Sequence, residues 1–343
     1  MGAIVAILGE AGDPELGERL QRMLARSPYR GEPEFLVEGP LAIGIQSMGW
    51  DASLHSAGNW LVAFHGYIGN WGDLARAHGL RFPEDASDAY RFAVAYEGLG
   101  DDLFAKLRGE WAVVIWDRRE QTLLAARDVI GCRPLFRQVF GGRTFLTTEV
   151  RQILAGSGAP VEIDFETFRM FLHCGPYRDR SSVCGVHQIP AGEVCVLEPC
   201  HDNFDAKPFF RFGSEWPALS RVDPRTAAEV VRDRLETAIR RASAACPMAV
   251  ALSGGLDSSA VVAISRELLG SKGEGPLHTF SAIRNHSSCL ESQCATAVID
   301  QGGVVAHTIL PADFAARRAE NDRIIDLCTD PFDLTMSVPQ AVY

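Results

Sequence analysis

Short apolar or alternating segments separated by turn residues dominate the first 200 residues. Such segments lie at residues 3–8, 41–46, 60–68, 111–117, 122–126, 143–147 and 194–197, and Gly, Pro, Asn or Asp separates many of them. This pattern predicts β-strands. Helical spacing occurs at residues 15–25, 88–97 and 165–173. Many strands with few helices predict layered sheets in an α+β domain.

A different pattern begins near residue 223. Asp223 and Pro224 suit the N-cap and first position of a helix over residues 224–244. Strands are then expected at 247–252, 277–283 and 304–309, and helices at 258–269, 291–301 and about 313–327. This alternation predicts an α/β domain with a doubly wound parallel sheet. We therefore expect domains at 1–200 and 224–343, joined by a linker over 201–223.

Composition and charge exclude several classes of function. The 343 residues carry 33 Lys and Arg against 44 Asp and Glu, and the net charge of −11 disfavours a nucleic-acid partner. No apolar run approaches the roughly 20 residues of a membrane helix. Residues 1–8 are too short for a signal peptide and are expected to form a buried strand. The nine cysteines form no CxxC pair, which indicates reduced thiols in a cytoplasmic protein. The nine histidines show no metal-ligand spacing either.

The strongest chemical signal is the heptad Ser253–Ser259, Ser-Gly-Gly-Leu-Asp-Ser-Ser, between a predicted strand and a predicted helix. Its glycines let the backbone approach a phosphate, and its hydroxyls and the helix N-terminus supply donors. Asp257 would repel a phosphate unless Mg²⁺ bridges the two, so its presence implies that metal. The structural alternative is a Gly turn with a capped helix, but the position after a buried strand favours phosphate binding.

No Walker loop is present, and the heptad instead resembles the pyrophosphate loop of the asparagine synthetase family, within the ATP-pyrophosphatase superfamily. Those enzymes adenylate a carboxylate, release pyrophosphate and let an amine attack the acyl-adenylate. The resemblance implies ATP and Mg²⁺ as cofactors, with Asp257 as the metal ligand. It places the following residues at ATP and pyrophosphate: Leu252, Ser253, Gly254, Gly255, Asp257, Ser258 and Ser281.

The first 200 residues resemble the glutaminase domain of the same family. Residues 64–70 stand where the family has NGEIYN, and residues 107–117 match LNGMFAFAIWD. Residues 126–136 match ARDRxGxKPLY, and residues 147–151 fit the ASEIK element. The resemblance implies an Ntn-type αββα sandwich for this domain.

Several departures indicate that this domain is not a working glutaminase. Gly2 stands where such an enzyme has its nucleophilic cysteine, and the next cysteine along the chain is Cys132. Gly66 and Tyr67 are taken to replace the Asn and Glu of NGEIYN, and Arg30 retains part of the RGPD glutamine-binding pattern. Without glutaminase activity the amine must come from elsewhere.

Relatives without that cysteine use the amine of the substrate itself. In lasso-peptide cyclases a side-chain carboxylate of a precursor peptide is adenylated and the N-terminal amine closes a macrolactam. The divergent glutaminase half and residues 330–339 favour this reading. It implies a precursor peptide as substrate, with a leader-peptide-binding protein and a leader peptidase as partners. The alternatives are a β-lactam synthetase acting on a small β-amino acid, amidation by free ammonia, and a non-enzymatic ATP-binding scaffold.

The family also has a later motif resembling GxGxDExFxGY, which carries a second metal-binding Asp. This motif does not occur up to Tyr343. The resemblance therefore predicts that the catalytic residues lie beyond Tyr343 and that the domain 224–343 is incomplete at its C-terminus.

Overall fold

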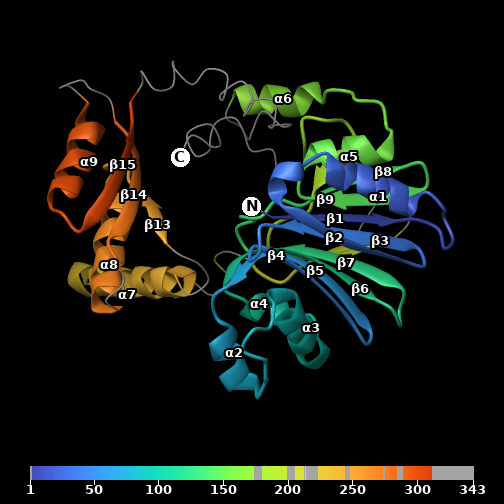
Figure 1. The fold of residues 1–343 in the computed structure, drawn as a ribbon, viewed down its shortest axis with the longest axis horizontal. Helices are drawn as coiled ribbons and strands as arrows, with labels where there is room; N and C mark the ends of the chain where they lie inside the picture. Colours follow the sequence, from blue (N-terminus) through green and yellow to red (C-terminus); the bar gives the residue numbers. More distant parts are fainter. Residues whose placement is uncertain are drawn as a thin grey trace. The chain divides into compact units, whose positions relative to one another are not determined.

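The computed structural model describes residues 2–173, 180–198, 205–211, 213, 223–243, 248–272, 275–283 and 289–310. The chain divides into two compact units, 1–215 and 216–343, and each is described by itself (Figure 1). The division between the units, after residue 215, lies within the expected linker 201–223. The strand β12 (Asp205–Pro208) pairs with a strand of the first unit, so part of the expected linker 201–223 extends that unit's sheet.

Two six-stranded antiparallel sheets form the centre of the first unit. In spatial order the first sheet comprises β10 (Val186–Gln188), β8 (Phe136–Phe140), β9 (Arg143–Thr147), β1 (Ala3–Leu8), β3 (Leu41–Ser47) and β2 (Glu32–Glu38). The second comprises β12, β11 (Glu193–Leu197), β7 (Thr122–Arg127), β6 (Gly109–Asp117), β5 (Trp60–Ile68) and β4 (Ala52–Ala57).

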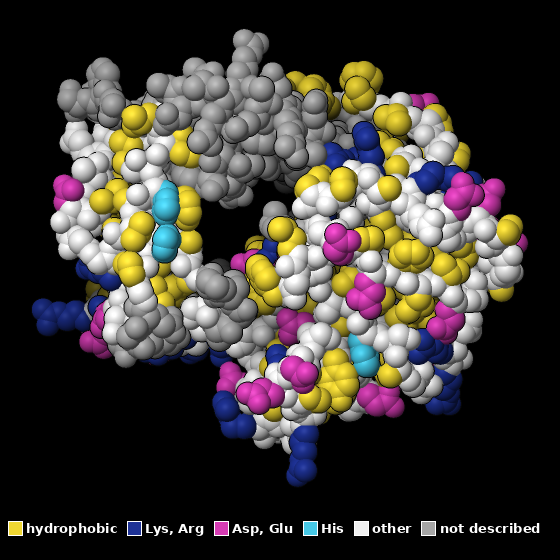
Figure 2. Space-filling view, viewed as in Figure 1, with side chains coloured by type: hydrophobic (Ala, Val, Ile, Leu, Met, Phe, Trp, Pro, Cys, Tyr) yellow, Lys and Arg dark blue, Asp and Glu magenta, His cyan; other side chains and the backbone are white. Residues whose placement is uncertain are grey.

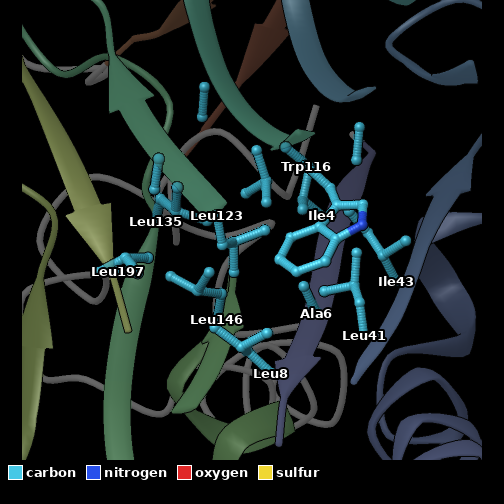
Figure 3. Packing of buried hydrophobic residues seen from close by; sticks show 14 of the residues in the cluster. Ile4, Ala6, Leu8, Leu41, Ile43, Trp116, Leu123, Leu135, Leu146 and Leu197 are labelled. Carbon is cyan, nitrogen blue, oxygen red and sulfur yellow. The ribbon is translucent and has the colours of Figure 1, made fainter. Parts of the chain in front are cut away.

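The largest core lies between these two sheets. Figure 3 shows Trp116 and Leu123 of the second sheet packing toward Ile4, Leu41 and Leu146 of the first. All five side chains are at most 1% exposed. Successive side chains of a strand point to opposite faces, so β1 directs its alternate residues into this core and the remainder toward the helices outside. This double burial explains the unbroken apolar run at residues 3–8.

Helices cover the outer face of each sheet (Figure 1). The helices α1 (Leu16–Ala25) and α5 (Val150–Ser157) pack on the first sheet, where Val5 and Phe145 contribute to a second core. The helices α2 (Trp71–His78), α3 (Asp88–Leu99) and α4 (Asp102–Lys106) cover the second sheet around Phe64 and Trp111. The order helix, sheet, sheet, helix confirms the expected αββα sandwich. The 3-10 helix η1 (Pro28–Arg30) and the helix α6 (Phe165–Leu172) complete the elements.

The sequence pattern missed the strands β2, β4, β8, β10 and β12. Four of the five lack a run of alternating or continuous apolar residues, and β2, β4, β10 and β12 are the edge strands of their sheets. An edge strand needs only one backbone ladder and can expose polar side chains on its outer side. Its pairing is therefore decided by its neighbour rather than by its own periodicity.

The second unit contains a parallel sheet in the order β13 (Ala249–Ala251), β14 (Leu277–Ala282) and β15 (Val304–Ile309). The helices α8 (Leu256–Lys272) and α9 (Leu290–Asp300) connect the three strands, which confirms the predicted α/β alternation. The helix α7 (Pro224–Ser243) packs on α8, and the Asp223 carboxylate accepts a hydrogen bond from the Thr226 N–H at 3.2 Å as predicted for an N-cap.

One face of this parallel sheet is covered by α8 and α9. A core unites Val250 and Leu277 of the strands with Val262 of α8 and Ala295 of α9. The alternate residues of β14 lie on the opposite face and are exposed or half-buried. The predicted helix at 313–327 lies outside the described residues. None of the helices described here is long and apolar enough to cross a membrane.

Candidate functional site

The heptad begins where β13 ends, and the sheet holds this point firmly. Leu252 is 1% exposed, and its N–H donates to the Phe280 carbonyl at 2.7 Å. The Ser281 hydroxyl, also 1% exposed, donates to the Leu252 carbonyl at 2.7 Å. The resemblance placed Leu252 and Ser281 near the nucleotide. In the structure both make hydrogen bonds at the strand end and so position the loop, and their place near the nucleotide stays a prediction.

Two hydroxyls face each other across the loop that follows. The Ser253 and Ser258 Oγ atoms lie 3.0 Å apart, and Ser258 Oγ accepts from the Ser253 N–H at 3.2 Å. Ser258 Oγ donates to the Gly255 carbonyl at 3.3 Å, and Ser253 Oγ accepts from the Gly255 N–H at 3.4 Å. The two hydroxyls thus accept hydrogen bonds from the N–H groups of Ser253 and Gly255. A bound phosphate oxygen could accept from the same N–H groups in their place.

The two glycines of the loop meet different steric demands. Gly254 has φ +87°, and a Cβ there would lie 2.2 Å from the Glu291 carbonyl oxygen and 2.7 Å from the Ala295 nitrogen. Gly254 is thus required for the close approach of α9. A Cβ at Gly255 would meet only Ser253 Oγ, at 3.5 Å. Gly255 is the position whose backbone is open to a ligand.

The first turn of α8 supplies the remaining polar groups. The Ser259 N–H donates to the Gly255 carbonyl at 3.1 Å, so the N–H groups of the three preceding residues have no helical acceptor. Such free donors, together with the helix dipole, favour an anion. Asp257 lies in this turn and is exposed.

The donor set at the loop fits Mg²⁺ held between the protein and a phosphate. Mg²⁺ is usually bound through one or two carboxylates plus substrate oxygens, and Asp257 offers one carboxylate beside the free N–H groups. Within the described ranges no group of three His, Cys, Asp or Glu side chains could hold a metal. Among the described residues, Asp257 is thus the carboxylate of this loop that would hold a metal.

In the first unit, no side chain fits at residue 2. Gly2 precedes β1 and is buried. A Cβ there would lie 2.7 Å from Ala52 Cβ, 2.9 Å from the Gln46 carbonyl oxygen and 3.0 Å from Asp51 Oδ1. The position that carries a nucleophilic side chain in a working glutaminase is closed by its neighbours.

The structure corrects the matching of residues 64–70 to NGEIYN. Gly66 has φ +118°, and a Cβ there would lie 1.9 Å from the Glu110 carbonyl oxygen, so no Asn fits at this position. Matching the glycine of the element to Gly66 places His65 at the Asn. His65 is therefore the residue at the Asn position of NGEIYN that the sequence analysis missed. The glycine shared by NGEIYN and residue 66 is the sequence signal that could have identified it.

His65 is a buried and neutral side chain. It is 1% exposed, and neither ring nitrogen has a hydrogen-bond partner among the residues described. It faces the layer between the sheets, on the same side of β5 as Leu61 and Ala63. Burial, reinforced by the charges of Arg133 and Arg30, lowers the pKa of His65 from 6.5 to about 3.

Close to Gly2, a cluster of polar side chains surrounds Glu149. Its carboxylate accepts hydrogen bonds from the Ser27 and Tyr29 hydroxyls and from Arg30 Nε, the last at 2.5 Å, and it pairs with Arg151 at 3.1 Å. Burial opposes ionisation, but Arg30 and the hydroxyls hold the pKa of Glu149 below its usual value. Arg30, which the resemblance linked to glutamine binding, is thus paired with a carboxylate of its own chain. We call these five residues the Glu149 cluster.

Cys132 does not replace the missing nucleophile. It lies in the loop after β7, where its N–H donates to Asp128 Oδ1 at 3.2 Å. Burial and the charges of Asp128 and Glu110 raise the pKa of the Cys132 thiol to about 11. Because the thiolate is the reactive species, Cys132 remains a weak nucleophile near neutral pH.

Two family models match the chain in succession. Residues 41–210 match the model described as a glutamine amidotransferase domain, and residues 230–342 match the model described as asparagine synthase. The second model and the asparagine synthetases among the relatives show that the chain is similar to the asparagine synthetase family. This similarity agrees with a sandwich of the glutamine amidotransferase type followed by a unit with a pyrophosphate-type loop.

Individual relatives match this chain only in part. Amidase chyE of Penicillium rubens is 33% identical over 187 residues, which are 53% of this chain and 27% of that protein. Amidase chry2 of Gibberella zeae is 31% identical over 63% of this chain, which is 31% of the length of that protein. Asparagine synthetase [glutamine-hydrolyzing] 3 of Bacillus subtilis is 27% identical over 67% of this chain, which is 38% of the length of that protein. The chain thus spans about a third of these relatives' lengths.

We predict that His65 makes the stability of the first unit depend on pH. His65 of the unfolded chain binds a proton below pH 6.5, whereas the buried ring of the folded chain binds one only near pH 3. Protonation of the unfolded state therefore lowers the free energy of unfolding as the pH falls below 6.5, and this loss is absent above pH 6.5. Between pH 7 and pH 5 the loss from His65 amounts to about 2 kcal/mol. Urea unfolding at both pH values, compared with His65→Asn, measures it.

The exposed His173→Asn is the control for this comparison and keeps the pH dependence of the natural protein. The carboxyls whose pKa values are lowered, such as Glu149, lose their contribution at lower pH and do not interfere in this window. An identical pH dependence in His65→Asn and the natural protein would contradict the prediction.

We also predict that the two loop glycines respond differently to alanine. Gly254→Ala forces a Cβ into α9 and a left-handed φ on alanine, and should destabilise the second unit by about 2–4 kcal/mol. Gly255→Ala should leave the melting temperature unchanged and weaken ATP binding. Differential scanning fluorimetry and ATP titration separate the two effects. Equal loss of stability in both variants would refute this division of roles.

Proposed function

We propose that this chain carries the ATP-binding part of an AMP-forming amide ligase that takes its amine from the substrate. In the form favoured here, a side-chain carboxylate of a precursor peptide is adenylated and its N-terminal amine closes a macrolactam, as in lasso-peptide maturation. The observation that carries the proposal is the heptad Ser253–Ser259, held at the end of β13 with Gly255 open and Asp257 exposed.

The proposed reaction has two balanced steps. A carboxylate oxygen of the substrate attacks the α-phosphorus of ATP, and pyrophosphate leaves. The amine nitrogen then attacks the acyl carbon, AMP leaves, and the amine loses a proton. The peptide as a whole loses one water. Holding the amine beside the acyl group supplies a high effective concentration, which replaces a diffusing amine.

Each residue of the loop has a defined part in this scheme. The Gly255 N–H and the free N–H groups at the start of α8 would bind pyrophosphate oxygens, and the Ser253 and Ser258 hydroxyls would supplement them. Asp257 would hold Mg²⁺. When bound, that ion neutralises phosphate charge and helps pyrophosphate to leave.

Loss of glutaminase activity is the second part of the proposal. Its support is steric and electrostatic: no Cβ fits at Gly2, and the Glu149 cluster engages Arg30. A substrate amine is therefore favoured over ammonia from glutamine. A leader-peptide-binding protein and a leader peptidase in the cytoplasm are the partners proposed for this reaction.

The reaction itself is tested with the natural full-length protein, ATP, Mg²⁺ and precursor peptides encoded beside it. Mass spectrometry detects loss of one water from the peptide, and chromatography detects AMP. Both together support the macrolactam synthetase. AMP formed only with a small β-amino acid identifies a β-lactam synthetase, and AMP formed only with free ammonia identifies an amidating enzyme. If no substrate gives AMP, the non-enzymatic ATP-binding scaffold is the alternative that remains.

We predict that Asp257→Ala lowers the rate of AMP formation by about 100-fold or more, because the metal loses its protein carboxylate. The fold should be retained, since Asp257 is exposed. Asp233→Ala, at an exposed position of α7, is the matched control and should keep full activity. Unchanged AMP formation in Asp257→Ala would exclude Asp257 from the metal site.

We predict that Gly2→Cys does not create a glutaminase. The new Cβ would overlap Ala52, so the variant should lose stability and release no glutamate from glutamine. The double variant Gly2→Cys/Ala52→Gly should recover part of the stability and still release none, because Arg30 stays paired with Glu149. Glutamate release by either variant would contradict the argument from steric overlap at residue 2 and from the Arg30–Glu149 pair, and would leave the missing thiol as the reason for the proposed loss of activity.

A further inference from the structure

The strand β2 ends the first sheet and has a neighbouring strand on one side only. It pairs with β3 over all seven of its residues. Its main contacts are with β3 and α1, whereas the segments 174–179 and 199–204 of this unit, which lie outside the described residues, adjoin α6, β11 and β12 in the sequence. Among the residues that the structure describes, β2 is thus an edge strand.

The hydrogen-bond pattern shows which backbone groups of β2 face away from the sheet. The Gly9 N–H donates to the Pro40 carbonyl at 2.9 Å, so the even-numbered residues of β3 direct their backbone groups toward β1. Hydrogen-bonded and non-hydrogen-bonded pairs alternate in an antiparallel ladder. Phe35 and Val37, which lie opposite even-numbered residues of β3, therefore direct their N–H and C=O groups outward.

The side chains of the same two residues form an exposed apolar strip. Phe35 is 39% exposed and Val37 is 49% exposed. Leu36, between them, packs against the core between the sheets, so Phe35 and Val37 lie on the opposite face, toward α1. A Cβ at Gly17 of α1 would lie 3.6 Å from Val37 Cγ2. An added strand would therefore cover this strip while it pairs with the outward backbone groups.

The other face of β2 is acidic. Glu32 and Glu34 are exposed and form no ion pair with a described Lys or Arg, whereas Glu38 pairs with Arg118 at 2.6 Å. Figure 2 shows acidic side chains among hydrophobic ones on the surface of the first unit where Figure 1 labels β2 and β3. An antiparallel second copy of β2, centred on Phe35, would place Glu32 opposite Glu38, which is unfavourable. Basic side chains opposite the two exposed glutamates are favourable instead.

We propose that β2 binds an extended peptide segment of another protein as an additional antiparallel strand, with apolar residues beside Phe35 and Val37 and basic residues beside the two exposed glutamates. In this mode of recognition main-chain hydrogen bonds give affinity and alternate side chains give specificity. Pro33 also faces outward but has no N–H, so the donors of this edge are Phe35 and Val37. The surface belongs to the first unit and does not depend on the function proposed for the heptad of the second.

A fluorescent peptide of sequence Thr-Val-Thr-Val-Lys-Val-Lys, titrated with the full chain at low ionic strength, tests this surface by fluorescence anisotropy. In the antiparallel arrangement its fourth residue lies opposite Phe35 and its two lysines lie opposite Glu34 and Glu32. We expect saturable binding. The peptide with both lysines replaced by glutamate should bind about tenfold more weakly, because like charges then face each other.

Two variants separate the contribution of the backbone from that of charge. Val37→Pro removes an outward N–H and leaves the ladder with β3 intact, because Pro33 already occupies an outward position of the same strand. Binding of the lysine peptide should fall by about tenfold or more. Glu34→Lys should reverse the preference between the two peptides. Glu84→Lys, an equal charge change at an exposed position outside β2, is the control and should leave the preference unchanged.

Melting temperatures show whether Val37→Pro folds. If it does not, the lysine peptide N-methylated at its fourth residue removes the matching hydrogen bond from the side of the ligand. Absence of saturable binding, equal binding of the two peptides, or full binding of the N-methylated peptide would overturn the proposal. Self-association of the natural chain that Val37→Pro abolishes, measured by sedimentation velocity, would overturn it in favour of a second copy of this chain.

Discussion

At Gly2, Gly66 and Gly254 neighbouring atoms come so close that no Cβ atom fits without a shift. At Gly2 these atoms are Ala52 Cβ, the Gln46 carbonyl oxygen and Asp51 Oδ1. At Gly66 and Gly254 they are backbone atoms of the adjacent strand β6 and of the first turns of α9. The overlaps with backbone can be relieved only by moving it, which a packed sheet resists. The first two contacts exclude side chains at these positions of the sandwich, and the third fixes the loop against α9.

The sandwich keeps its architecture because its stability does not depend on a nucleophile. The core between the sheets and the two outer cores bury Trp116, Phe145 and Phe64, and none of these side chains is among the close neighbours of Gly2. Beside Gly2, the Glu149 cluster satisfies its own charges. Removing one member of such a buried pair leaves an uncompensated charge and costs about 3–5 kcal/mol. The Glu149 cluster is thus a stabilising part of the unit.

The second unit places its chemistry on the most strongly held point of a small sheet. Backbone and side-chain hydrogen bonds from β14 fix Leu252, so the donors of the next five residues start from a defined position. Preorganised donors of this kind need little rearrangement when an anion binds. Fold alone does not establish the reaction, because one fold supports many chemistries. The proposed function therefore rests on the loop residues and on the close packing around Gly2.

Sequence periodicity by itself determined the strands that are buried on at least one whole face. The bounds predicted for the buried strands β1, β5 and β9 agree with the structure to the residue, and so do those of β15, whose side chains are exposed or half-buried. The heptad at the end of β13 was equally clear, because its chemistry lies in seven consecutive residues. In these segments the side chains needed for the structure or the site are neighbours in the sequence.

Only the tertiary structure assigned β4 and β12 to a sheet and separated the role of Gly254 from that of Gly255. It also moved the Asn position of NGEIYN to His65 and showed that the Ser281 hydroxyl donates to the Leu252 carbonyl. Each of these properties depends on atoms far away in the sequence, such as the Glu291 carbonyl beside Gly254. The local sequence pattern decides which helices and strands can form. The space around a residue and its contact partners are set by segments that are distant in the sequence and come close only in the folded chain.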